Sequence, residues 1–307
     1  MIVGIVAAAL ALTMLPFFGD LYVTYVATQI LIFILFATSL NLLLGYAGLV
    51  SFGHAAYFAI GGYACSIFVT TLEWPLIAAY PAAVILSGVA ALFIGHFCVR
   101  LTTFYFSMLT LAFAQLVWAI AFKWKVVTGG DDGFLRIAVP EALAGPAAYY
   151  LFTLVVVTAS MAALWVIAHS AFGRMLVTIR ENPVRAGFMG VDIKRVQTVA
   201  FAIAGAFAGA AGALFAMFNR SFFPDSAWWT QSAEVLIMVV LGGMHAFFGP
   251  AIGAATLIAL GRLTSEVTEY WPTVLAAILI AVLFAFPDGI AGLFAQRPRA
   301  EASRAAD

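Results

Sequence analysis

This sequence contains very few charged residues. Only 9% of its 307 residues are Asp, Glu, Lys or Arg, against roughly a quarter in a typical soluble domain. Asp20 and Glu73 are the only charged residues before Arg100. The basic residues are few and mostly gather in one loop and the C-terminal tail, so nothing supports nucleic acid as a partner.

The chain also lacks the motifs of a self-contained enzyme. None of its lysines follows a glycine, so it has no Gly-x-x-x-x-Gly-Lys phosphate loop, and it has no His-Glu-x-x-His zinc motif. Its two cysteines, Cys65 and Cys98, lie in apolar runs without metal-ligand spacing, which is typical of buried apolar side chains. We expect no catalytic residues, no metal site and no cofactor bound by this chain.

What remains is apolar: 65% of the residues are hydrophobic, in continuous runs. Runs of about 20 residues match the length that a helix needs to cross ~30 Å of hydrocarbon. The runs show no alternation of the barrel kind, so helices are favoured. We predict an all-α, polytopic transmembrane helical bundle. About ten spans are expected, at residues 2–18, 21–44, 55–72, 75–98, 103–122, 148–168, 197–218, 232–247, 250–264 and 272–287.

Lysine and arginine set the expected orientation, because cytoplasmic loops carry an excess of both. With loop 170–196 inside, nine of the 14 Lys and Arg residues lie inside, and nine of the 14 Asp and Glu residues lie outside. Both termini are then cytoplasmic, and loop 123–147 is periplasmic. We therefore expect a transmembrane domain over residues 1–290, in the lipid bilayer, and a cytoplasmic tail over 291–307.

Loop 170–196 contains signals for a short helix. Asn182 is a favourable N-cap, Pro183 suits the first helical position, and Gly190 suits the end. A helix over 183–189 would be amphipathic and could seat in a partner's groove. Its apolar side would carry Val184, Phe188 and Met189, flanked by Arg180 and Arg185. The alternative is an ordinary basic loop whose arginines face lipid headgroups.

Polar residues within the predicted spans are few. Such residues usually face protein or water, and hydrogen bonds between helices explain most of them. Contact with a transported substrate is the alternative. The candidate residues of a substrate pathway are Asn41, Tyr46, Ser51, His54, Tyr57, Thr110 and Gln115.

Small residues suggest two further features. Gly205, Gly209 and Ala213 recur at four-residue spacing, which favours close helix packing, with a pore-lining role as the alternative. The junctions Phe52-Gly53-His54-Ala55 and Phe248-Gly249-Pro250-Ala251 resemble each other. Paired interruptions of this kind can mark broken helices around a central site.

Several segments in order resemble one family, the permease subunits of branched-chain amino acid ABC importers of the LivM type. The segments are residues 39–58, 105–115, 128–133 and 173–190, followed by Leu241-Gly242-Gly243 and Phe248-Gly249-Pro250. The resemblance extends over residues 37–292. Leu49 departs from the pattern, since many relatives have a glutamine there.

The resemblance implies a permease subunit of an ATP-driven importer in the bacterial inner membrane. It implies a second, LivH-like permease, two LivG- and LivF-like subunits that bind ATP, and a periplasmic substrate-binding protein. Contact with the ATP-binding subunits is expected at Arg174, Arg180, Glu181, Asn182, Pro183, Arg185 and Gly190. The alternatives are a permease for urea or short amides, a stand-alone secondary transporter or channel, and a membrane enzyme.

Overall fold

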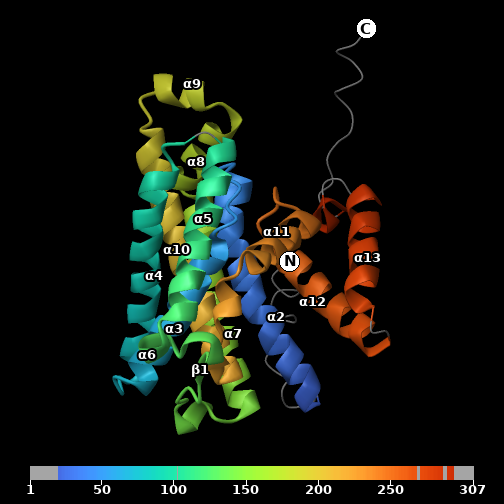
Figure 1. Cartoon of the computed structure of the whole chain (residues 1–307). Coiled ribbons are helices and arrows are strands. Elements are labelled where there is room, and N and C mark those ends of the chain that lie inside the picture. The colour runs from blue at the N-terminus through green and yellow to red at the C-terminus, as the bar shows by residue number, and fades with distance from the viewer. Residues whose placement is uncertain (1–19, 102, 268–269, 286–288, 294–307) are drawn as a thin grey trace.

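A computed structural model describes residues 20–101, 103–267, 270–285 and 289–293 and is mostly helical (Figure 1). The predicted span 2–18 and residues 294–307 of the predicted tail lie outside the described residues. The helices are α2 (Leu21–Asn41), α3 (His54–Thr70), α4 (Leu76–Cys98), α5 (Thr103–Lys123), α6 (Lys125–Thr128), α7 (Pro146–His169), α8 (Ala171–Glu181), α9 (Pro183–Phe188), α10 (Ile193–Asn219), α11 (Trp229–Gly242), α12 (Gly249–Val267) and α13 (Trp271–Ala285). Two short strands, β1 (Phe134–Leu135) and β2 (Ser221–Phe222), pair antiparallel.

Among the described residues, five segments are long and apolar enough to cross a membrane. They are Leu21–Tyr46, Leu76–Cys98, Phe104–Lys123, Pro146–His169 and Ile193–Asn219. The apolar helices α3 and α11 are shorter, with 17 and 14 residues. The predicted spans 55–72 and 232–247 therefore correspond to helices below the usual spanning length of about 20 residues. A total of ten crossings stays a prediction.

The glycine stripe lies where α10 packs against α3 and α4. A Cβ built on Gly205 would meet Ala91 of α4, and one built on Gly212 would meet the backbone of Phe58 on α3. The hydroxyl of Ser87 lies 2.8 Å from the carbonyl oxygens of both Tyr57 and Gly205, and so joins the three helices. These contacts favour the packing interpretation of the stripe.

Loop 123–147 and the pair α8–α9 lie at opposite ends of the molecule (Figure 1). In the loop, β1 pairs with β2 so that Phe134 faces Phe222 in register. The Thr128 hydroxyl, on α6, donates to the carbonyl of Ala121 at 2.6 Å and ties the loop back to α5. The opposite placement agrees with the predicted alternation, but the side of the membrane that each end faces stays a prediction.

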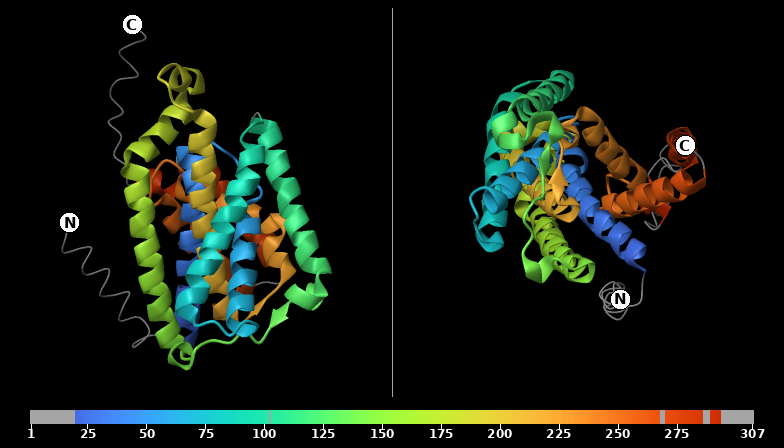
Figure 2. Two further views of the ribbon diagram at one scale, coloured as in Figure 1. Left: turned by 90° about the vertical axis from the view of Figure 1, so that its left-hand side faces the viewer. Right: turned by 60° about the horizontal axis from the view of Figure 1, so that its bottom comes forward.

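Both glycine-rich junctions are helix interruptions. A π-helix, Leu42–Tyr46, extends α2 and is followed by irregular backbone before α3 begins at His54. Irregular residues 243–248 separate α11 from α12. The two interruptions touch, because a Cβ on Gly45 would meet the backbone oxygen of Met244. Figure 2 shows α2 between the α3–α5 group and the arm formed by α12 and α13.

Candidate functional site

The predicted helix in loop 170–196 is confirmed as α9, and its ends are capped as expected. The Asn182 side-chain oxygen accepts a hydrogen bond from the backbone N–H of Arg185 at 2.9 Å, and Pro183 occupies the first turn. Gly190 has a φ of +82°. Backbone bonds from Gly190 to Gly187 (3.0 Å) and from Val191 to Ala186 (3.2 Å) close the C-terminal end as a Schellman motif.

α9 lies at the tip of the molecule (Figure 1), and its apolar side chains are exposed. Val184, Phe188 and Met189 are 67%, 89% and 61% exposed, whereas Ala186 is fully buried. Six residues capped at both ends form a short element whose apolar side chains find no cover within the described chain. An exposed apolar cluster of this kind is typical of an interaction site.

α9 is held by α8, a helix that we did not predict. The Ser170 hydroxyl caps α8 by accepting from the N–H of Phe172 at 3.2 Å. Leu176 and Ile179 are buried, whereas Arg174 is exposed. The sequence does contain a signal for α8, since Ser170 precedes apolar residues that recur every three to four positions. The basic composition of the loop obscured it.

The predicted coupling residues fall into two groups. The first group is exposed around α9 and consists of Glu181, Asn182, Pro183, Arg185 and Gly190. The second group, Arg174 and Arg180, lies on α8, where Arg174 donates to the carbonyl of His169 at 3.1 Å.

Arg180 departs from the prediction that it flanks the apolar side of α9. Its guanidinium turns away and donates to the backbone carbonyl of Gly45. The reason is that a helix end leaves carbonyls without intrahelical partners, and Arg180 reaches such an end from the inner side of α8.

The predicted pathway residues divide into a packed group and a group at a small cavity. His54 and Tyr57 are buried in protein: the imidazole lies 2.9 Å from the Ser39 hydroxyl, and Tyr57 packs edge-on against Phe201. Thr110 accepts from the N–H of Phe52 at 3.3 Å, beside the α2–α3 interruption.

Ser51 accepts from the N–H of Gly53 at 3.3 Å, so it lies at the same interruption as Thr110. Gln115 lies farther along α5, and its buried Nε2 has no hydrogen-bond partner among the described residues.

Asn41 and Tyr46 line a cavity of about 10 Å³ with Thr38, Leu42, Leu164, Ala168 and Phe247. Asn41 is 1% exposed, and neither oxygen nor nitrogen of its amide has a partner in the described part of the chain. Thr38 was missed by the sequence reasoning. Its position three residues before Asn41, on the same side of α2, was the available signal.

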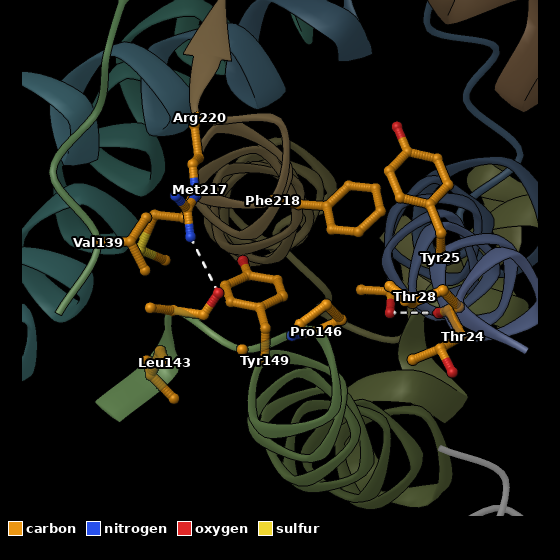
Figure 3. Close-up of a pocket in the computed structure, with 13 residues that line it drawn as sticks. Thr24, Tyr25, Thr28, Val139, Leu143, Pro146, Tyr149, Met217, Phe218 and Arg220 are labelled. Atoms are coloured by element: carbon orange, nitrogen blue, oxygen red, sulfur yellow. Dashed lines mark hydrogen bonds between the residues drawn. The ribbon is translucent and has the colours of Figure 1, made fainter. Parts of the chain in front are cut away.

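A larger cavity of about 160 Å³ lies at the other end, between α2, α7 and α10 (Figure 3). Arg220 reaches into it and donates to the carbonyl of Ala144 at 3.0 Å. The rings of Tyr25 and Phe218 lie beside it, tilted by 34° with centroids 4.5 Å apart, and the Tyr149 hydroxyl donates to the carbonyl of Leu214 at 2.6 Å. The sequence reasoning did not single out these residues.

Known proteins resemble this chain over most of its length. Residues 22–285 match a family described as branched-chain amino acid transport system / permease component. The chain is 26% identical to the high-affinity branched-chain amino acid transport system permease protein LivM of Salmonella typhimurium, over 86% of this chain and 69% of that protein. It is 24% identical to the corresponding LivH protein of Escherichia coli K12, over 87% and 92%.

A third relative covers less of the chain. It is the autoinducer 2 import system permease protein LsrC of Photorhabdus laumondii, 28% identical over 52% of this chain and 49% of that protein. No solved structure matches the chain. Because the family match spans residues 22–285, the chain belongs to the branched-chain amino acid transport system permease family and is a multi-pass membrane permease subunit of an ABC importer, of the LivM type.

Proposed function

We propose that this subunit forms part of the path by which branched-chain amino acids cross the bacterial inner membrane. It pairs with a LivH-like permease, receives cargo from a periplasmic binding protein, and is driven by two ATP-binding subunits. The LivM and LivH relatives, whose names specify branched-chain amino acid transport, support this cargo. The LsrC relative shows that similar permeases also serve another import system.

The observation that carries the proposal is the exposed, doubly capped α9. In an ABC importer the ATP-binding subunits supply the conformational energy, and they can shift the permease only through contacts that differ between two states. Phe188, 89% exposed at the tip of the molecule, offers such a contact. In this proposal α8 and α9 are cytoplasmic, loop 123–147 is periplasmic, and both termini are inside.

Few polar residues lie within the predicted spans, which agrees with selection of cargo by an external protein. A stand-alone secondary transporter would instead need coupling-ion groups deep in the spans.

The test is reconstitution of the assembled complex in proteoliposomes, with labelled leucine carried by the binding protein outside and ATP inside. We expect uptake that requires ATP and both ATP-binding subunits. Uptake that persists without those subunits would instead show a transporter acting alone. If urea or acetamide inhibits uptake of the labelled leucine and valine does not, the cargo belongs to the amide class instead.

A further inference from the structure

The small cavity beside α2 contains polar groups that the fold leaves unpaired. Thr38 and Asn41 are 3% and 1% exposed. The Thr38 hydroxyl and both ends of the Asn41 amide have no hydrogen-bond partner among the described residues. Buried polar groups are normally paired because an unpaired one costs free energy. Three unpaired atoms lying within one helical turn can therefore accept the polar groups of a ligand.

The cavity is too small for any cargo in the present conformation. At about 10 Å³ it approaches the room that one water molecule needs, which is on the order of 10–15 Å³. Its walls include Leu164 of α7 and Phe247 of the irregular segment 243–248. The site is therefore closed, and cargo could enter only after a wall moves.

One wall of the cavity lies outside the neighbouring helices. Phe247 lies in the interruption between α11 and α12, outside the ladder of either helix. Gly243, at the start of this segment, has a φ of +107°, a conformation that other residues rarely adopt. Withdrawal of the Phe247 ring alone would widen the cavity toward Asn41.

On the basis of the proposed function, we propose that Thr38 and Asn41 form a cargo-binding site that Phe247 closes. The amide of Asn41 offers both donors and an acceptor, and the Thr38 hydroxyl offers one of each, so together they suit the carboxylate and ammonium groups of an amino acid. Leu164 and Phe247 provide apolar surface for an aliphatic side chain.

The site also lies where the docking element can influence it. The carbonyl of Gly45, four residues after Asn41, accepts the hydrogen bond from Arg180 of α8. Leu164 belongs to α7, which continues into α8 through Ser170. Movement of α8 is therefore transmitted to two walls of the cavity, and opening is linked to the ATP-driven partners.

The experiment replaces the polar groups by apolar groups of similar size. In the proteoliposome system, Asn41→Leu and Thr38→Val should each lower ATP-dependent leucine uptake, about tenfold for Asn41→Leu, while ATP hydrolysis stays within about twofold. The melting temperature of the purified permease should stay the same or rise, because an unpaired buried group is removed. Asn41→Ser keeps a donor and an acceptor and should retain more uptake than Asn41→Leu.

The matched control is Ser66→Ala, which removes a buried hydroxyl that bonds within its own helix, to the carbonyl of Gly62. It should leave uptake unchanged. Unchanged uptake in both Asn41→Leu and Thr38→Val would overturn the site, leaving a cavity that holds water at most. Lower uptake together with a lower melting temperature in both would also overturn it, in favour of a structural role. Failure of the wild-type complex to transport leucine would count against the proposed function instead.

Discussion

The guanidinium of Arg180 donates a hydrogen bond to the backbone carbonyl of Gly45, across 135 residues of sequence. The same arginine passes over Gly48, where φ is +70° and an added Cβ would lie 2.7 Å from Arg180 Cγ. The segment that follows α2 therefore contacts the aliphatic part of Arg180 as well as its guanidinium. This contact joins the helix that carries α9 to the backbone beside Asn41.

Replacing Arg180 should uncouple ATP hydrolysis from transport. Arg180→Met keeps most of the stem and removes the charged hydrogen bond, for which about 1.5–3 kcal/mol is typical. We expect fewer leucine molecules transported per ATP hydrolysed, with the complex still assembled. The ratio of uptake to phosphate release in proteoliposomes measures this.

Arg195→Met is the control for loss of a positive charge from the same loop. Its ion pair with Asp192, at 2.8 Å, is largely exposed, so its removal should have little effect. An unchanged transport ratio in Arg180→Met would show that the contact with Gly45 carries no coupling.

Phe188 should be an anchor for the ATP-binding subunit. Its side chain is 89% exposed, so Phe188→Ser removes little internal packing and should leave the melting temperature unchanged. A buried aromatic anchor typically contributes about 2 kcal/mol or more to an interface. Its loss in Phe188→Ser should therefore raise the dissociation constant roughly thirtyfold. Titration of the detergent-solubilised permease with its ATP-binding partners measures the change.

Phe188→Leu, which keeps an apolar side chain, should bind more tightly than Phe188→Ser. Equal affinity of the serine variant and the wild type would mean that α9 does not dock by this face, and that its apolar side chains lie against lipid headgroups instead.

The cap of α9 should matter for docking through the order of the helix. Asn182→Ala removes the oxygen that accepts from the Arg185 N–H at 2.9 Å, at a typical cost of about 1 kcal/mol. A helix of six residues has little else to hold its first turn. We expect faster amide hydrogen exchange at Arg185 and weaker binding of the ATP-binding subunits.

Asn182→Asp retains a capping oxygen and should restore both the protection of that amide and the affinity. If exchange at Arg185 is as slow in Asn182→Ala as in the wild type, the order of α9 comes from its neighbours and not from the cap.

The features that could be predicted from sequence are those fixed by neighbouring residues. Asn182, Pro183 and Gly190 determine α9 locally, so its bounds were predicted to within one residue. The direction of Arg180 depends on a carbonyl 135 residues away, and hydropathy cannot show it. Likewise, the apolar runs at 55–72 and 232–247 do not reveal that their helices end early, at Thr70 and Gly242.

Gly209 separates the packing and pore-lining interpretations of the glycine stripe. A Cβ at this position would lie 2.5 Å from the Ser87 hydroxyl of α4, and the backbone of Gly209 abuts Gly61 of α3. Gly209→Ala should therefore destabilise the permease by about 1–3 kcal/mol, the usual cost of overpacking. Thermal unfolding in detergent measures this change. In Gly261→Ala, on α12, an added Cβ has no neighbour within 4 Å, so this matched control should leave stability unchanged or raise it. A pore-lining glycine would give the opposite pattern, with normal stability of Gly209→Ala and altered leucine uptake.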